Sequence, residues 1–370
     1  MNMKVETTIK PWFVPYVGVE KYSIHPTETY SGRLQFNENL WGPSPKCLKV
    51  LSEITDIDLK FYDLEENDYL LDALSALIHV PVNCLYVSFG SSEVLKAIFD
   101  VALQKDDVVL IPNPGWGCYN GMVTAKLGRT ETYRVVAGDD EYYHDINDIL
   151  IKAKQINPKI IILTTPQMPT GNRISQEAVK KIAESNPNTL VVIDECYYGC
   201  AEMNLDVGKI INDFDNVIFV RSLSKIYGLA NLRIGFGITN PKLVELIDYV
   251  LPLHKLPNIA RKIAVAAIED VEYTEKNKRE IIESRNYLIQ ELNKREGVTA
   301  YKSYSNFVYV KLDGYDAKAL HGYMMTNGIT TRLFEDEGET HMRITVAPKD
   351  ILDYALGLLD EGCKHLRNVK

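Results

Sequence analysis

The sequence predicts an α/β protein with a large domain built on a mostly parallel sheet flanked by helices, and a smaller α+β domain. Strand and helix patterns alternate through the middle of the chain, between about residues 85 and 239. Two of these strands, 160–163 and 190–193, are apolar on both faces, which is typical of a parallel sheet that helices cover on both sides. From about residue 252 two long helical stretches and a few short strands replace the alternation.

The chain is expected to fold in three parts: an N-terminal arm over residues 1–40, a large domain over 41–251 and a small domain over 252–370. A length of 370 residues is sufficient for a large core and two unequal domains. Prolines at positions 11, 15 and 26 interrupt the arm, so an extended segment that completes the small domain is expected there.

The expected elements follow in chain order. Ser44 and Pro45 mark the start of the first helix, because serine caps helix N-termini and proline is favoured in the first turn. The large domain should then contain helices 45–54 and 68–79, strand 85–89, helix 94–103, strand 108–112, helix 117–127, strand 132–136, helix 146–155, strand 160–165, helix 176–185 and strands 190–194, 216–222 and 233–239. The small domain should contain helices 259–269 and 274–295, strands 306–312, 329–333 and 341–346, and helix 351–366.

The composition argues against several classes of protein. A formal net charge of −9 does not suit a nucleic-acid-binding surface, which needs clustered lysine and arginine. No stretch approaches the ~18 uninterrupted apolar residues of a membrane span. Residues 1–15 lack the apolar region of a signal peptide, so a cytoplasmic protein is expected. The six cysteines form no CxxC pair and the seven histidines form no cluster, so no metal site is indicated.

One loop carries the strongest chemical signal. Lys225 follows a strand and lies between Ser222 and Ser224 on one side and Arg233 on the other. Cationic neighbours and partial burial favour a neutral, nucleophilic lysine amine, while hydroxyls and a guanidinium suit a phosphate. These residues predict a lysine that forms a Schiff base with pyridoxal phosphate (PLP). A solvated surface loop explains the same short motif, so the prediction depends on the rest of the chain.

Other polar residues follow predicted strands, at the edge of the sheet where ligands bind in open α/β folds. Asp194 ends the run 190–193 and is suited to hold a pyridine nitrogen protonated. Tyr197 can donate to the ring's 3-oxygen, and Trp116 offers a face for stacking. The segment 90–92, Gly-Ser-Ser, can bind phosphate at a helix start. Each also has a structural interpretation, as a helix cap, a core aromatic residue or a capping box.

Taken together, the motifs resemble those of the histidinol-phosphate aminotransferase family, which are fold-type I PLP enzymes. The similarity covers essentially the whole chain, in the right order. The segments that carry it are Asn37–Pro45 (NENPYGPSP in the family), Phe61–Asp63 (YPD), Gly90–Glu93 (GSDE), Pro169–Asn172 (PTGN), Asp194–Tyr197 (DEAY), Ser222–Arg233 (SLSKxxGLAGLR), Ser305–Phe307 (SxANF) and Met342–Thr345 (LRIT).

The resemblance implies a role for each matching residue. Lys225 would bind PLP and carry the proton between the substrate α-carbon and the cofactor, and Asp194 and Tyr197 would bind the ring. The phosphate would be held by Ser222, Ser224, Arg233, Gly90, Ser91 and Ser92, with Tyr62 of a neighbouring subunit; an ungapped match puts Phe61 in that place. The substrate would be bound by Arg343, Asn39, Tyr16 and Arg332. A homodimer with shared sites is also implied.

Three departures from the family pattern bear on the reaction. Met168 replaces the asparagine that binds the 3-oxygen, and a thioether cannot donate that hydrogen bond. Phe89 and Ser92 replace the Asn and Asp of NGSDE, and Asn231 replaces a glycine.

The leading hypothesis is an aminotransferase that uses glutamate as amino donor and a small phosphorylated or anionic carbonyl compound as acceptor. The alternative on the same fold is a decarboxylase or another lyase of an O-phospho amino acid, because reaction type depends on substrate pose. A third hypothesis is a non-catalytic PLP-binding module.

Overall fold

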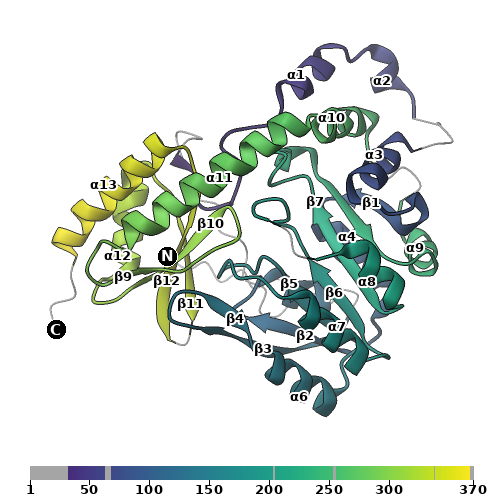
Figure 1. Ribbon diagram of the computed structural model, residues 1–370, viewed down its shortest axis with the longest axis horizontal. Helices are drawn as coiled ribbons and strands as arrows, with labels where there is room; N and C mark the ends of the chain where they lie inside the picture. Colours follow the sequence, from purple (N-terminus) through teal and green to yellow (C-terminus); the bar gives the residue numbers. More distant parts are fainter. Residues whose placement is uncertain (1–31, 63–67, 203–204, 253–255, 337, 367–370) are drawn as a thin grey trace, which may run out of the picture.

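The chain forms a large sheet and a small sheet, each covered by helices (Figure 1). The computed structural model describes residues 32–62, 68–202, 205–252, 256–336 and 338–366. The small sheet and its helices lie beside the large sheet. Within these ranges no helix is both long and apolar enough to cross a membrane.

The large sheet has eight strands, and five adjacent strands are paired in parallel. In spatial order the strands are β1 (Leu85–Phe89), β8 (Ile234–Ile238), β7 (Val217–Ser222), β6 (Leu190–Asp194), β5 (Ile160–Thr164), β2 (Val108–Asn113), β3 (Arg129–Ala137) and β4 (Tyr142–His144). Strands β7, β6, β5, β2 and β3 are parallel. Strand β8 is antiparallel to both of its neighbours, and β4 is antiparallel to β3. The predicted mostly parallel sheet is therefore confirmed.

Helices cover both faces of this sheet, as the apolar strands require. Along β5, Ile160 and Ile162 pack into one core while Ile161 and Leu163 pack into the other. This alternation follows from the two-residue period of a strand. One face carries α4 (Ser91–Ala102), α5 (Cys118–Ala125) and α9 (Pro241–Asp248). The other carries α3 (Tyr69–Ile78), α6 (Ile146–Ile156), α7 (Gln176–Ser185), α8 (Val207–Asp213) and α10 (Asn258–Ile268).

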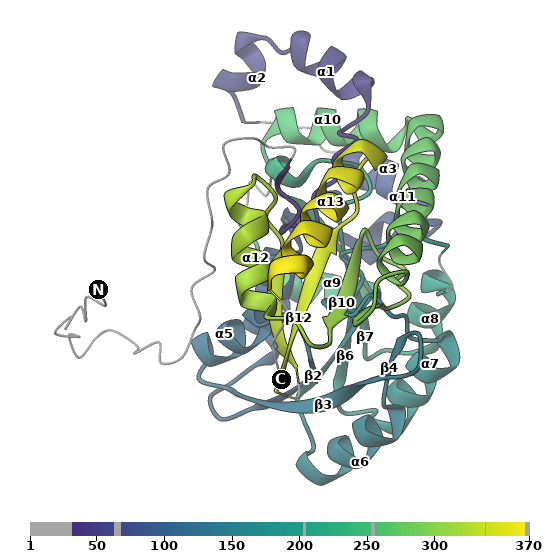
Figure 2. The same cartoon turned by 90° about the vertical axis from the view of Figure 1, so that its left-hand side faces the viewer.

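The small sheet is antiparallel, with β11 (Arg332–Asp336), β12 (Glu339–Thr345), β10 (Phe307–Leu312) and β9 (Val298–Ala300) in that order. Its helices are α11 (Val271–Leu292), α12 (Ala317–Thr326) and α13 (Lys349–His365). Figure 2 shows α13 in front of this sheet, with α12 and α11 to either side. The arm contributes as expected, because Leu34 is buried in this core.

The domain limits are less simple than the sequence suggests. Helix α10 lies after residue 252, yet its buried residues belong to the core of the large sheet and it packs on α1 (Pro45–Ser52) and α3. Helix α11 contributes Ile281 to that core and Leu288 to the core of the small sheet. The division at residue 252 stays a prediction, and α11 is the element that joins the two cores.

Most predicted elements are present, with shifted ends. Helix α4 begins at Ser91 rather than Val94. Gly90, with φ +80°, is not in a helical conformation and caps the helix directly before Ser91. Strand β11 begins at Arg332 rather than 329, since the backbone of Thr330 is bonded to Gly32 of the arm instead. Elements that the sequence did not predict are α2 (Asp56–Lys60), β4, α8, α9, β9 and α12.

Candidate active site

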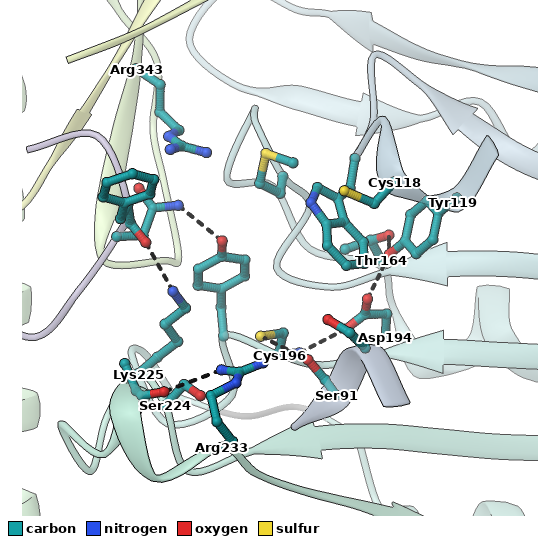
Figure 3. A pocket seen from close by; sticks show the side chains of 17 residues that line it. Ser91, Cys118, Tyr119, Thr164, Asp194, Cys196, Ser224, Lys225, Arg233 and Arg343 are labelled. Atoms are coloured by element: carbon teal, nitrogen blue, oxygen red, sulfur yellow. Dashed lines mark hydrogen bonds between the residues drawn. The ribbon is translucent and has the colours of Figure 1, made fainter. Parts of the chain in front are cut away.

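A cavity of about 480 Å³ lies where strand ends of the large sheet meet the arm and the small sheet (Figure 3). The ends of β5 and β6, the loop after β7 and the start of α4 form one wall. Residues of the arm and of β12 line the opposite side. The lining residues are Phe36, Asn37, Ser91, Ser92, Trp116, Cys118, Tyr119, Thr164, Met168, Asp194, Cys196, Tyr197, Ser224, Lys225, Ala230, Arg233 and Arg343.

Lys225 projects its amine into the cavity. Its Nζ donates a hydrogen bond of 3.0 Å to the carbonyl oxygen of Phe36 and lies 5.5 Å from the centre of the Tyr197 ring. Burial lowers the pKa of the Lys225 amine, and the positive charge of Arg343 lowers it further. A lysine with a lowered pKa has more of the neutral amine that attacks carbonyl compounds.

One end of the cavity is built for an anion. Ser222 Oγ bonds to Ser224 Oγ at 2.7 Å and accepts from the Ser224 backbone N–H at 3.0 Å, which orients both hydroxyls. Helix α4 begins here with Ser91 and Ser92, so its unpaired N–H groups face the same region. A Cβ on Gly90 would come within 2.6 Å of Nη2 of Arg233. Only glycine therefore lets the guanidinium reach this position, and the set of donors fits a phosphate.

Another part of the cavity wall holds a buried carboxylate. Asp194, at the end of β6, is only 3% exposed and accepts hydrogen bonds from the Tyr119 hydroxyl at 2.6 Å and the Cys196 backbone N–H at 3.0 Å. Tyr119 is held in turn by Thr164 at 2.9 Å. Burial raises the pKa of Asp194, while these hydrogen bonds oppose the rise. A buried carboxylate is stabilised by a cation, and a protonated pyridine nitrogen in the cavity would supply one.

Tyr197 stands beside the lysine. Its hydroxyl oxygen accepts a hydrogen bond of 2.9 Å from the side-chain amide of Asn37. Its ring packs edge-on against Phe307, with the centroids 5.0 Å apart. Met168, 5% exposed, belongs to the same small apolar cluster and lines the cavity. The thioether therefore lies at the cavity wall, where the family pattern has a hydrogen-bond donor.

The structure brings most of the predicted site residues together. Those that line the cavity are Lys225, Asp194, Tyr197, Ser224, Arg233, Ser91, Ser92, Trp116 and Arg343. Ser222 and Gly90 lie directly behind this lining, against Ser224 and Arg233.

Of the remaining four predicted residues, Asn39, Tyr62 and Arg332 are not among those that line the cavity. The Asn39 amide donates to the carbonyl of Ile226 at 2.9 Å. Tyr62 is 73% exposed. Arg332 lies on β11, opposite Arg343 in the strand register. Tyr16 lies outside the described residues.

Several cavity residues were assigned no role from the sequence. Tyr119 and Thr164 support Asp194, and a buried acidic residue that needs hydrogen-bond donors is the signal that points to them. Asn37 belongs to a motif that the sequence singled out, but only Asn39 was assigned a role. Phe36 acts through its main-chain oxygen, which carries no signal in side-chain type. The other lining residues without an assigned role are Cys118, Cys196 and Ala230.

Comparison with known proteins agrees with this geometry. The model of the "Aminotransferase class I and II" family matches residues 33–358. The histidinol-phosphate aminotransferase of Methanocaldococcus jannaschii is 30% identical over 345 residues, which cover 92% of this chain and 91% of that protein.

Solved structures share the fold. Histidinol-phosphate aminotransferase from Sinorhizobium meliloti, in complex with pyridoxal-5'-phosphate, has a TM-score of 0.82 and 26% identity, and the match covers 90% of this chain and 91% of that one. L-threonine-O-3-phosphate decarboxylase from Porphyromonas gingivalis has a TM-score of 0.77, 19% identity and coverage of 90% and 99%, which shows the shared fold alone. The chain belongs to the aminotransferase class I and II family, and it is a PLP-dependent transaminase.

Proposed function

We propose that the protein transfers an amino group from glutamate to a small phosphorylated or otherwise anionic carbonyl compound. Relatives that carry the name histidinol-phosphate aminotransferase support the phosphorylated substrate class. The observation that carries this proposal is Arg343, a buried cation across the cavity from Lys225 and Arg233 (Figure 3). Its side chain is 2% exposed and lies 5.4 Å from the rings of both Phe307 and Phe334. A guanidinium in such surroundings binds a carboxylate or phosphate in a fixed, bidentate geometry.

The proposed roles divide the cavity wall by chemistry. When bound, PLP supplies an aldehyde that takes up the amino group and a ring that accepts electrons. Lys225 Nζ holds the cofactor and moves the proton at the substrate α-carbon. Asp194 keeps the pyridine nitrogen protonated, Tyr197 donates to the 3-oxygen, and Trp116 stacks on the ring. The phosphate is held by Ser222, Ser224, Arg233, Gly90, Ser91 and Ser92.

On the substrate side we assign the main anion contact to Arg343. Asn39 and Arg332 are supporting candidates. The Asn39 amide donates a hydrogen bond to the carbonyl of Ile226, the residue after Lys225, and Arg332 is paired with Arg343 in the sheet register.

The surface supports a homodimer with shared sites. The first two helices after the arm, and the residues that follow them, expose large apolar side chains. Their exposed fractions lie between 51% and 73%, for Leu48, Leu51, Ile57, Leu59, Phe61 and Tyr62. An apolar surface of this kind is typical of a protein–protein contact. We propose that it meets a second copy, with Tyr62 or Phe61 reaching the partner's phosphate-binding residues. A monomeric mass of the holoenzyme in light scattering would overturn this assignment.

The test of the main proposal is a half-reaction. Glutamate added to the purified holoenzyme should remove the visible cofactor absorbance and release one equivalent of 2-oxoglutarate per site. Histidinol phosphate should then be tried as an alternative amino donor, and it should bleach the same band. If neither compound changes the absorbance, the proposed donor and substrate class are both wrong.

One observation favours a second candidate, a decarboxylase or other lyase of an O-phospho amino acid. Met168 lines the cavity and cannot donate to the 3-oxygen, so the electronic setting of the ring differs from that of the relatives. Carbon dioxide released from O-phosphothreonine or O-phosphoserine, with no 2-oxoglutarate from glutamate, would favour this candidate. Release of 2-oxoglutarate without carbon dioxide would exclude it.

A further inference from the structure

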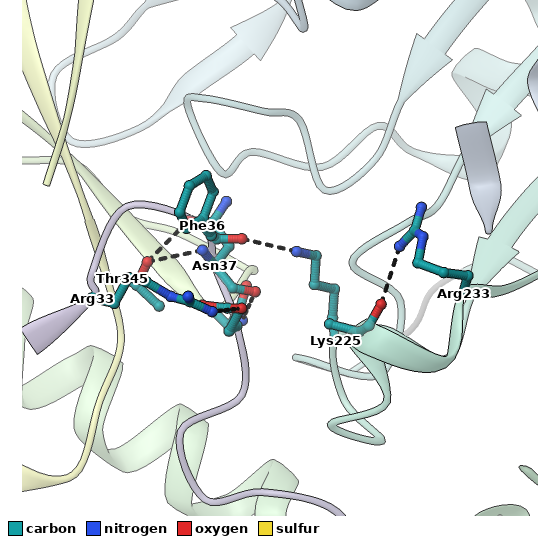
Figure 4. A network of polar contacts seen from close by, with 9 residues as sticks. Arg33, Phe36, Asn37, Lys225, Arg233 and Thr345 are labelled. Carbon is teal, nitrogen blue, oxygen red and sulfur yellow. Dashed lines mark hydrogen bonds and ion pairs between the residues drawn. The ribbon is translucent and has the colours of Figure 1, made fainter. Parts of the chain in front are cut away.

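Three consecutive residues of the arm each contact a different functional side chain of the cavity. The Gln35 carbonyl accepts a hydrogen bond from the Arg343 guanidinium. The Phe36 carbonyl accepts from Lys225 at 3.0 Å. The Asn37 side-chain amide donates to the Tyr197 hydroxyl oxygen at 2.9 Å. Figure 4 shows Phe36 and Asn37 beside the end of the Lys225 side chain. Of the three, only Asn37 acts through its own side chain, so only its contact is specified by residue type.

The small domain fixes the position of Asn37. Its backbone N–H donates to Thr345 Oγ1 at 3.0 Å (Figure 4). Its carbonyl accepts from the Asn306 amide at 2.9 Å. Thr345 Oγ1 donates in turn to the Leu34 carbonyl at 2.7 Å. Asn37 has a φ of +55°, a left-handed conformation that asparagine tolerates better than most residues. The amide is therefore held rigidly against Tyr197.

The direction of this hydrogen bond has a chemical consequence. A phenol that accepts a hydrogen bond at its oxygen becomes a stronger donor through its own O–H, because neighbouring hydrogen bonds polarise one another. Tyr197 has the proposed task of donating to the cofactor's 3-oxygen. Met168 supplies no donor there, so the 3-oxygen depends more heavily on Tyr197 in this chain. A donor at that oxygen withdraws negative charge, which otherwise stabilises a proton on the Lys225 nitrogen.

We propose that Asn37 is a positioning residue that sets the acidity of the Lys225 nitrogen in the holoenzyme by polarising Tyr197. This inference rests on the proposed role of Tyr197. The other charged and titratable groups that act on the same nitrogen are Cys196, Arg343, Glu38 and Cys200, and a substitution at position 37 replaces none of them.

The test is a spectroscopic pH titration of the holoenzyme, in which the visible absorbance reports the proton on the Lys225 nitrogen. Asn37→Gly removes the amide without adding charge, and glycine accepts the left-handed backbone without strain. We expect its titration midpoint to lie roughly half to one pH unit above that of the wild type, because one hydrogen bond is lost. Asn37→Asp should raise it further, since a carboxylate accepts the Tyr197 hydrogen.

Tyr197→Phe provides the control. It should raise the midpoint at least as much as Asn37→Gly, and Asn37→Gly added to Tyr197→Phe should have no further effect. A wild-type midpoint in Asn37→Gly would overturn the inference. It would also be overturned if Asn37→Gly shifted the midpoint of Tyr197→Phe by as much as it shifts that of the wild type. A loss of apoprotein thermal stability without a change in midpoint would also overturn it. If Tyr197→Phe itself titrates like the wild type, the proposed role of Tyr197 fails instead.

Discussion

The two sides of the cavity are assembled by different kinds of contact. On the large-sheet side, Asp194 is bonded to the backbone of Cys196 two residues away, and Ser222 to Ser224 across the same short interval. On the other side, Asn37 and Thr345 are 308 residues apart, and Lys225 and Phe36 are 189 apart. The first side is set by the ends of strands in one sheet. The second exists only when the arm and the small domain are both docked.

This difference separates two functions. The large-sheet side gathers the phosphate donors and the buried carboxylate, so we expect it to determine cofactor binding. The arm and β12 supply Arg343 and the contacts to Lys225 and Tyr197, so we expect them to determine substrate binding and proton transfer. Substitutions on each side test whether the two functions can be separated.

The largest effect should come from Lys225→Ala. Both the covalent attachment and the proton transfer are lost, so activity should fall by about 10⁴-fold or more. The visible absorbance of the cofactor should disappear as well. The matched control is Lys242→Ala on α9, an exposed lysine that should leave both readouts unchanged. Wild-type absorbance and activity in Lys225→Ala would mean that another residue holds the cofactor.

Asp194→Asn should lower kcat by about 10³-fold, because an amide cannot keep the ring nitrogen protonated. The fold should survive, since an amide can accept from Cys196 N–H and donate to Tyr119, which can then donate to Thr164. Cofactor absorbance, activity and circular dichroism of the variant check these points. Loss of activity together with loss of the folded state would assign Asp194 a structural role instead.

The same variant gives a pH test in the apoprotein. Burial raises the pKa of Asp194 above its ordinary value of 3.8. Between the ordinary pKa of the unfolded chain and the raised pKa of the folded protein, the folded protein binds a proton that the unfolded chain does not. The free energy of unfolding therefore falls as pH rises through this window. Asp194→Asn has no carboxyl group at this position and lacks this pH dependence. Its unfolding midpoint should therefore improve relative to the wild type as pH rises above 3.8; a constant difference would contradict the raised pKa.

Arg343→Gln tests the other side of the cavity. Removal of a buried cation that binds the substrate anion should lower kcat/KM by roughly 10²-fold, mainly through KM. The affinity for the cofactor should change little, because Arg343 lies away from the phosphate donors. Arg332→Gln, on the neighbouring strand, should have a smaller effect. A tenfold loss of cofactor affinity in Arg343→Gln would show that the two sides are not separable.

The sequence was informative about the first side and much less about the second. Asp194 and Lys225 follow apolar strands, and chain direction alone places such residues at one edge of a parallel sheet. Arg343 was predicted only through the resemblance. Nothing in the side chain of Phe36 indicates that its carbonyl meets Lys225, because that contact depends on how the arm docks. The packing of α10 on the large-sheet core was missed as well, because it also depends on contacts between segments far apart in the sequence.

The smallest predicted effect concerns the residue at which the two sides meet. Met168 packs with Tyr197 and Phe307 in one small cluster. Met168→Asn therefore introduces the hydrogen-bond donor of the family pattern next to Tyr197, whose hydroxyl oxygen already accepts from Asn37. A second donor at the 3-oxygen should lower the pKa of the Lys225 nitrogen in the holoenzyme by about half a unit. If glutamate is the amino donor, kcat with glutamate should change only a few-fold. If the O-phospho amino acid lyase is correct, carbon dioxide release should fall while glutamate turnover rises. Opposite changes in these two activities would therefore identify Met168 as a determinant of reaction type rather than a neutral replacement.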